Sequence, residues 1–183
     1  LQEILSLLGT FYPKRIPPQT LLEQVGLLDK AGSYVKHLSG GQVQRFTVAA
    51  GLINDPELII LDEPTTGLDP QARRNIWALI REIHQRGVTV VLTTHYMEEA
   101  EALCDRVGII AAGRLLALDT VDNLRISCGH SYKTTSTGNS MGREEEVLYG
   151  TSEEDVASQA RALGIDDFTI SKTSLEDVYL ALA

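Results

Sequence analysis

Apolar residues recur every three or four positions through the first part of the chain and then gather into short continuous runs. The helical spacing covers residues 3–8, 19–25 and 42–53, which are separated by prolines and glycines and predict three helices. Residues 58–61 and 88–93 are uninterrupted apolar or β-branched runs, typical of parallel strands buried on both faces. The pattern predicts a helical segment followed by a parallel sheet.

The two predicted strands are joined by a helix with clear signals at both ends. Asp69 suits the N-cap, Pro70 the first helical position and Gly87 the position after the last turn. A strand–helix–strand crossover places both strands in parallel, so their carboxyl ends, at Asp62 and near His95, open on one edge of the sheet. Ligands of open α/β sheets bind at such an edge.

The second half of the chain predicts a hairpin and a small α/β appendage. We expect helices at residues 96–103, 153–163 and 175–181 and strands at residues 107–111, 114–118 and 168–170, with a further strand from residue 146 onward. Residues 127–142 are rich in Ser, Thr, Gly and Asn, which indicates a loop or a weak strand and a boundary.

Composition excludes several classes of protein. The 183 residues carry 16 Lys and Arg against 25 Asp and Glu, and this net charge of −9 has the wrong sign for wrapping nucleic acid. No run approaches the roughly 18 apolar residues of a membrane-spanning helix. Cys104 and Cys128 lack the spacing of a zinc site and favour a reducing compartment. The chain starts at Leu1 without a signal sequence, so we expect a piece of a longer protein.

The pentapeptide Leu-Ser-Gly-Gly-Gln, residues 38–42, lies where a loop enters a predicted helix. Gly40 and Gly41 leave backbone N–H groups uncovered beside the positive end of the helix dipole, so a phosphate can approach closely, and Ser39 can add a hydroxyl donor. An ordinary N-cap at Ser39 is the structural alternative. Gln42 completes the pentapeptide. In chains of this length and average composition, the five residues would occur by chance in only about one of several thousand.

Two adjacent acids, Asp62 and Glu63, follow the first predicted strand. Held in one site, two carboxylates repel and need a compensating cation or proton. We interpret Asp62 as a ligand of Mg²⁺ and Glu63 as the group that orients and deprotonates an attacking water, as acids at such strand ends do in P-loop nucleotidases. Two solvated loop acids are the alternative.

His95 follows the second predicted strand and reaches the same sheet edge as Glu63. An imidazole there can hydrogen-bond a γ-phosphate or the water, although a lone histidine more often has a structural role. For Asp69, capping of the following helix is a sufficient explanation, and a second role stays open.

Residues 38–42, 58–69 and 93–95, in this order, resemble the motifs of the nucleotide-binding domain of ATP-binding-cassette (ABC) transporters, and the resemblance covers roughly residues 1–126. It implies an α/β fold: a partial P-loop NTPase core with a helical signature subdomain and a small α/β appendage. The implied domains are residues 1–126, made of a helical signature subdomain over residues 1–52 and the Walker B and switch core over residues 53–126, and an accessory domain of residues 127–183.

The resemblance also implies a role for each motif. Residues 38–42 look like the signature motif and residues 67–69 like the D-loop, which together imply ATP contacts from Ser39, Gly40, Gly41, Gln42 and Asp69. The strand that ends in Asp62 looks like Walker B, with Asp62 on Mg²⁺, Glu63 as catalytic base and His95 as the switch histidine. The expected cofactors are ATP and Mg²⁺.

Several elements of the family pattern are missing. The sequence has no Gly-x-x-x-x-Gly-Lys-Ser/Thr phosphate loop, and the adenine-stacking aromatic and the Q-loop glutamine would lie before Leu1. In the family, two domains sandwich two ATP molecules head to tail, and the phosphate loop and Walker B of one face the signature of the other. We therefore expect this chain to hold only a portion of each site, to bind nucleotide weakly and to be inactive alone.

The resemblance implies an ATP-hydrolysing subunit that drives export through a membrane permease. We expect a peripheral protein at the cytoplasmic face of the cell membrane, with a second nucleotide-binding domain, as a homodimer, and a transmembrane permease subunit as partners, and no nucleic acid. Residues 174–180 are similar to the tail of the drug-exporter, type-2 branch. The alternatives are a soluble cassette ATPase of DNA repair or translation and a non-catalytic regulatory domain that has lost its phosphate loop.

Overall fold

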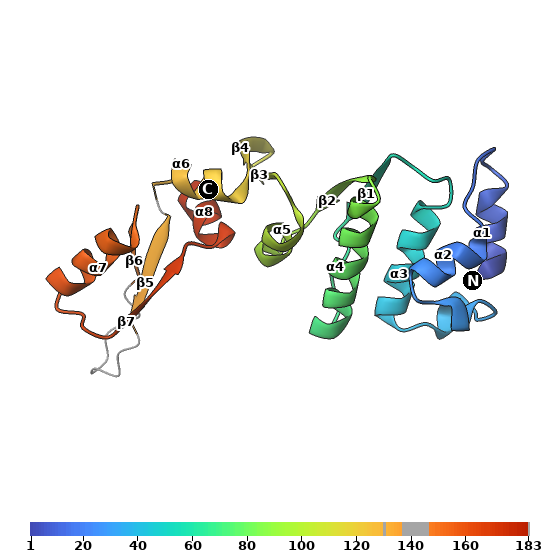
Figure 1. Cartoon of the computed structure of the whole chain (residues 1–183), viewed down its shortest axis with the longest axis horizontal. Coiled ribbons are helices and arrows are strands. Elements are labelled where there is room, and N and C mark those ends of the chain that lie inside the picture. Colours follow the sequence, from blue (N-terminus) through green and yellow to red (C-terminus); the bar gives the residue numbers. More distant parts are fainter. Residues whose placement is uncertain (130, 137–146, 183) are drawn as a thin grey trace. The chain divides into compact units, whose positions relative to one another are not determined.

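The computed structural model describes residues 1–129, 131–136 and 147–182. By its contacts the chain divides into two compact units, Leu1–His95 and Tyr96–Ala183, which are described one at a time (Figure 1). Each unit combines helices with strands, so the expected α/β class is confirmed.

The first unit begins with a group of short helices. They are α1 Gln2–Gly9, α2 Pro18–Gln24, α3 Gly40–Gly51 and the two 3-10 turns η1 Leu28–Lys30 and η2 Val35–His37. Leu5, Leu21 and Leu22 are fully buried among them, because apolar residues three or four positions apart share one face of a helix. The three helices expected from the pattern are confirmed, with ends shifted by one or two residues.

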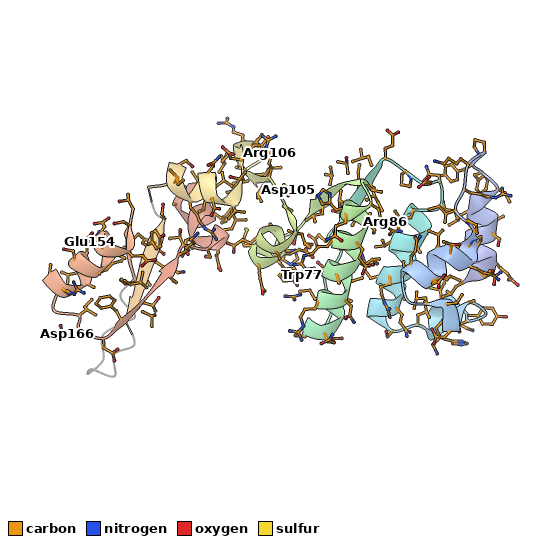
Figure 2. The ribbon with its side chains drawn as sticks, in the orientation of Figure 1. Trp77, Arg86, Asp105, Arg106, Glu154 and Asp166 are labelled. Atoms are coloured by element: carbon orange, nitrogen blue, oxygen red, sulfur yellow. The ribbon has the colours of Figure 1, made fainter. Side chains whose placement is uncertain are left out.

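A two-stranded parallel sheet follows in the same unit. β1 Leu58–Asp62 pairs with β2 Thr89–Thr93, and α4 Pro70–Gln85 forms the crossover between them. The side chains that α4 buries are Ile76, Trp77, Leu79, Ile80 and Ile83, of which Figure 2 labels Trp77. The predicted strand–helix–strand arrangement is confirmed, and the pairing of Asp62 with Thr93 puts both carboxyl ends at one edge.

The expectation that both strands are buried on both faces is wrong. Ile59 and Leu61 are buried, whereas Leu58 is 50% and Ile60 69% exposed. Successive side chains of a strand point to opposite faces of the sheet, and α4 packs on β2, so only one face is covered. Leu58 and Ile60 on the uncovered face therefore form an apolar surface in contact with solvent. This is unusual, because parallel sheets normally have both faces covered.

The second unit starts with a helix and a β-hairpin. α5 Met97–Leu103 leads into β3 Val107–Ala111, which pairs antiparallel with β4 Arg114–Asp119. Ala112 and Gly113 form the turn, both with positive φ, 47° and 73°. Two central residues with positive φ give the turn whose twist matches that of a hairpin, so the predicted hairpin and its turn are confirmed.

A three-stranded antiparallel sheet in the order β6-β5-β7 forms the rest of this unit with the helices around it. The elements are α6 Val121–Ser127, β5 Tyr132–Ser136, β6 Val147–Gly150, α7 Glu153–Ala162, β7 Phe168–Lys172 and α8 Leu175–Leu182. Sequence patterns did not predict α6, because seven residues are too short for a helical period to stand out. Of the predicted loop or weak strand, residues 132–136 are β5, and residues 130 and 137–142 lie outside the described residues.

One apolar core unites both ends of the second unit. Leu124 of α6 packs in the same cluster as Leu175 and Val178 of α8 and Val107 and Ile109 of β3. By contacts, therefore, the unit extends across residue 126, because α8 returns to complete the core that the hairpin begins. The domain division at residues 126 and 127, which rests on family resemblance, stays a prediction.

A carboxylate ties the C-terminal sheet to α8. The two oxygens of Asp177 accept hydrogen bonds from Lys133 Nζ at 2.7 Å, from Ser174 N and Oγ, both at 2.7 Å, and from the Tyr149 hydroxyl at 3.0 Å. Burial by itself raises the pKa of Asp177, but these hydrogen bonds outweigh it and lower the pKa to about 2. The charged carboxylate therefore joins β5, β6 and α8.

The helices of both units are short, and the longest one described, α4, has 16 residues. Across the described residues, no helix combines the length and the apolar character that spanning a bilayer requires.

Candidate functional site

The pentapeptide at residues 38–42 forms the start of α3. The Ser39 hydroxyl accepts a hydrogen bond from the N–H of Gln42 at 3.4 Å, and Oε1 of Gln42 accepts one from the N–H of Ser39 at 3.0 Å. This capping box gives both side chains a structural role. It leaves the amides of Gly40 and Gly41 available to an anion, since the first N–H groups of a helix have no partner within it.

The two glycines also let α3 approach α4 closely. A Cβ at Gly41 would lie 3.0 Å from Cβ of Ala72, and one at Gly40 would lie 3.7 Å from Cδ2 of Leu68. A side chain at Gly41 would therefore crowd Ala72, so a glycine suits the close packing of the two helices here. As a result, the start of α3 lies against the start of α4.

Asp69 caps α4 in the way that the sequence predicts. Its Oδ1 accepts hydrogen bonds from the N–H groups of Gln71 and Ala72, each at 2.9 Å. Capping accounts for this carboxylate. It lies next to Leu68, which faces Gly40, so the cap and the signature-like pentapeptide belong to neighbouring helix starts.

The acids and the histidine meet at the carboxyl edge of the sheet. Oε1 of Glu63 lies 3.3 Å from Nδ1 of His95, and the two side chains are 47% and 55% exposed. Oε2 of Glu63 accepts a hydrogen bond from the Thr66 hydroxyl at 3.0 Å. Asp62, the last residue of β1, is exposed beside them. The crossover topology thus brings together the three residues that the sequence analysis assigned to this edge.

These contacts form separate clusters on the first unit. The polar contacts of Ser39 and Gln42 stay within the first turn of α3, and those of Asp69 stay within the first turn of α4. Glu63 and His95 contact each other at the sheet edge. A nucleotide site built from all of them would have to span these clusters.

Asp62 has the chemistry of a Mg²⁺ ligand. Among the described residues no three His, Cys, Asp or Glu side chains converge on one point that suits a metal ion. Magnesium usually keeps several waters and takes one or two carboxylates together with substrate phosphates. A single exposed carboxylate at a sheet edge fits that kind of site, in which the nucleotide completes the coordination.

Two threonines at this edge were not singled out by sequence reasoning. The Thr93 hydroxyl donates a hydrogen bond to Oδ1 of Asp62, and Thr66 holds Glu63. The signal that could have pointed to Thr93 is the pairing of the two strands. When the carboxyl ends of the strands are aligned, residue 93 falls opposite residue 62. Threonine is common in strands because of its β-branched shape, so the presence of a threonine there did not indicate a functional role.

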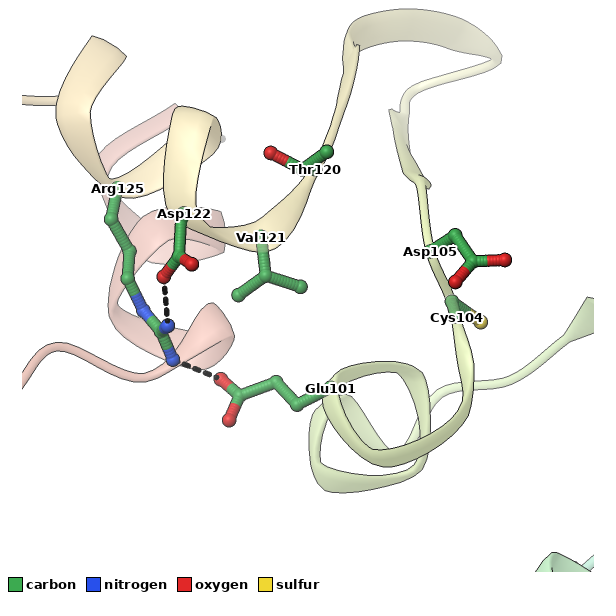
Figure 3. A pocket seen from close by; sticks show the side chains of 7 residues that line it. All are labelled: Glu101, Cys104, Asp105, Thr120, Val121, Asp122 and Arg125. Carbon is green, nitrogen blue, oxygen red and sulfur yellow. Dashed lines mark hydrogen bonds and ion pairs between the residues drawn. The ribbon is translucent and has the colours of Figure 1, made fainter. Parts of the chain in front are cut away.

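The second unit holds a polar pocket of about 370 Å³ (Figure 3). Arg125 lies at its wall and pairs with Glu101 at 3.4 Å and Asp122 at 3.1 Å, while its Nε donates to the carbonyl oxygen of Thr173 at 2.6 Å. Burial, with the charges of Glu99 and Asp105, raises the pKa of the Cys104 thiol that also lines it. The arginine links α5, α6 and the segment before α8, which is a structural role.

Comparison with known proteins gives partial matches. A family model described as "AAA domain, putative AbiEii toxin, Type IV TA system" matches residues 24–99. A Nod factor export ATP-binding protein I from Rhizobium meliloti is 41% identical over 179 residues, 89% of this chain and 53% of its own length. The protein of that name from Rhizobium leguminosarum bv. viciae is 57% identical over 98 residues, 54% of this chain and 32% of its own length. The chain thus spans about a third to a half of these relatives.

Solved structures of ABC transporter subunits are similar to this chain in fold. An ATP binding subunit of an ABC transporter superposes with a TM-score of 0.59 at 32% identity, covering 70% of this chain and 55% of that one. The protein cbiO1 from Clostridium perfringens, part of the ABC transporter complex cbiONQ, gives a TM-score of 0.55 at 29% identity, covering 59% of this chain and 43% of that one. By sequence and by fold, therefore, the chain is similar to the ATP-binding subunits of ABC transporters.

Proposed function

We propose that this chain is the C-terminal part of an ATP-hydrolysing subunit that drives an export-type membrane permease. The observation that carries the proposal is the meeting of Glu63 and His95 beside Asp62 at the carboxyl edge of a parallel sheet. Residues 1–126 belong to the nucleotide-binding domain and residues 127–183 to an accessory domain. The names of the relatives, which describe export of Nod factor, favour export over other uses of such a subunit.

The chemistry proposed for the edge follows from its side chains. Asp62 would hold Mg²⁺, which would supply positive charge to the phosphate oxygens of bound ATP. Glu63 accepts a proton from the attacking water, and its contact with Thr66 holds the carboxylate in place. His95, within reach of Glu63, can hydrogen-bond the γ-phosphate or the water.

The rest of the site comes from a second copy in this proposal. The amides of Gly40 and Gly41, with the dipole of α3, suit a phosphate group, but their cluster is distinct from that of the acids. In a head-to-tail homodimer the signature-like pentapeptide of one copy faces the nucleotide held by the other. The dimer would associate with a transmembrane permease at the cytoplasmic face of the cell membrane.

The 183-residue chain by itself should bind Mg-ATP weakly and hydrolyse none. Its sequence lacks the phosphate loop, whose lysine and backbone amides provide most of the triphosphate contacts in P-loop proteins. Calorimetric titration is expected to give a dissociation constant weaker than about 100 μM. Micromolar affinity would contradict this aspect of the proposal.

The proposal as a whole is tested on the complete natural protein that contains these residues. Its gene should encode a phosphate loop before residue 1, and the purified protein should hydrolyse ATP in the presence of Mg²⁺. A start codon next to Leu1 would instead favour a regulatory domain without catalysis. Hydrolysis stimulated by DNA or by ribosomes, with no permease association, would favour a soluble cassette ATPase.

Replacement of Ser39 separates its capping role from a phosphate contact. Asp is about as good an N-cap as Ser, so Ser39→Asp should leave the melting temperature unchanged, whereas Ser39→Ala should cost α3 about 1 kcal/mol. If the hydroxyl faces the γ-phosphate of a partner's nucleotide, the new carboxylate repels it. We expect the ATPase rate of the complete protein to fall at least ~10-fold in the Asp variant. A rate that follows stability alone would leave Ser39 only its capping role.

A further inference from the structure

Thr93 occupies the position opposite Asp62 in the parallel sheet. Paired residues of neighbouring strands point to the same face, so Asp62 and Thr93 share the uncovered face with Leu58, Ile60 and Val91. Thr93 is the last residue of β2 and is exposed. Its side chain therefore packs against no core and is free to act through its hydroxyl.

The hydroxyl of Thr93 makes two hydrogen bonds of opposite sense. It donates its proton to Oδ1 of Asp62 and accepts the backbone N–H of Glu63 at 3.2 Å. A hydroxyl has one donor and two lone pairs, so both contacts can be made at once. One side chain on β2 thus holds the two consecutive acids at the end of β1.

Glu63 needs such a restraint because its backbone is unusual. Its φ is 44°, in the left-handed region, which residues with a side chain rarely adopt. The N–H of Glu63 also donates to the carbonyl oxygen of Thr93 at 3.0 Å, so Thr93 holds this peptide by main chain and side chain. The turn directs the carboxylate of Glu63 to His95 and Thr66 instead of continuing the strand.

We infer that Thr93 is a positioning residue for the metal and the base, an inference that rests on the function proposed above. It holds the carboxylate of Asp62, which would supply a ligand to the cation, and it fixes the peptide that carries the carboxylate of Glu63. Groups that orient a metal ligand typically change metal affinity or activity by roughly 10- to 100-fold when they are removed.

The decisive variant is Thr93→Val, which keeps the shape and the β-branch and removes only the hydroxyl. Thr93→Ser restores the hydroxyl without the methyl group. Thr89→Val is the matched control, because Thr89 begins the same strand on the same face, exposed and opposite Leu58. If the valine variant does not fold, Thr93→Ala takes its place. All are made in the complete subunit.

Three measurements are needed, and only one of them depends on turnover. Electron paramagnetic resonance gives the affinity for Mn²⁺ of the protein loaded with a non-hydrolysable ATP analogue, and steady-state kinetics gives kcat. Thr93→Val should weaken Mn²⁺ binding about 10-fold and lower kcat about 10-fold. Nucleotide affinity in EDTA should stay within about twofold of wild type, and the Ser and Thr89 variants should match wild type in all three.

The outcomes separate this inference from the function on which it rests. If Thr93→Val binds Mn²⁺ and turns over as wild type while Glu63→Gln is inactive, Thr93 has no positioning role and the proposed function stands. An equal loss in the Ser and Val variants would also overturn the inference, because the hydroxyl would not be what matters. If Glu63→Gln itself hydrolyses ATP normally, the proposed site is wrong.

Discussion

Glu63→Gln should lower the ATPase rate of the complete subunit by at least ~100-fold, because a positioned general base contributes about 10²- to 10⁴-fold. Gln has nearly the same size and its amide oxygen can still accept the hydrogen bond from Thr66. It cannot accept a proton from water at neutral pH. The substitution therefore removes the proton acceptor and keeps the size of the side chain at the edge of the sheet.

Glu57→Gln is the matched control for this prediction. Glu57 is an exposed acid just before β1, at the opposite end of the strand from Glu63, and its carbonyl oxygen accepts the N–H of Thr89 through the main chain. The same chemical change at that end should leave the rate within about twofold of wild type. Equilibrium binding of a fluorescent ATP analogue should be unchanged or tighter in Glu63→Gln. A wild-type rate would remove Glu63 from the role of base, and loss of nucleotide binding would show that its role is structural.

Asp177→Asn should destabilise the second unit by about 2 to 3 kcal/mol at neutral pH, because hydrogen bonds to a charged group are worth roughly 1.5 to 3 kcal/mol. The variant leaves Lys133 without its carboxylate and weakens the bonds from Ser174 and Tyr149. The side chain of Asp177 is only 10% exposed, so solvent screens these contacts little. Native-state hydrogen exchange of β5 and α8 amides measures the loss in this unit separately from the first.

The same carboxylate gives the second unit a dependence on pH. Its folded pKa, about 2, lies below its usual value of 3.8, so its contribution to stability is fully present above about pH 4 and is lost as the pH falls towards 2. The difference in pKa corresponds to about 2 kcal/mol. Wild type and Asp177→Asn should therefore converge in stability near pH 2.

Asp166→Asn serves as the control, because Asp166 is an exposed acid in the loop before β7 (Figure 2). We expect its effect on the exchange rates to stay within about 0.5 kcal/mol at every pH. A parallel acid transition in Asp177→Asn and wild type would mean that other carboxylates carry the pH dependence of this unit.

Local signals in the sequence predicted most of the elements. The helix of residues 70–85 was expected from Asp69, Pro70 and Gly87 and from its apolar stripe, and each of these acts over one or two turns of the chain. The hairpin turn at Ala112 and Gly113 was likewise expected from adjacent residues. The elements that sequence reasoning did not predict firmly, α6 and β5, are short and carry weak periodicity, so tertiary contacts decide them.

The same distinction holds for the candidate site: some of its residues could be predicted from the sequence, and others depend on tertiary contacts. The sequence identified Asp62, Glu63 and His95 from their positions at the ends of two expected strands, because the handedness of a crossover is nearly invariant. It did not identify Thr93, whose role depends on being directly opposite Asp62. Nor did it show that Gly41 packs closely against Ala72.

By itself, then, the sequence determined most of the helices and strands, the motifs they carry and the edge of the sheet where Asp62, Glu63 and His95 lie, because propensity, capping and crossover topology are local or general properties of the chain. The tertiary structure alone decided which faces of the sheet are covered, which hydroxyl meets which carboxylate and how Asp177 joins three elements. These depend on strand register and on contacts between residues tens of positions apart, where a shift of one residue turns every side chain to the other face.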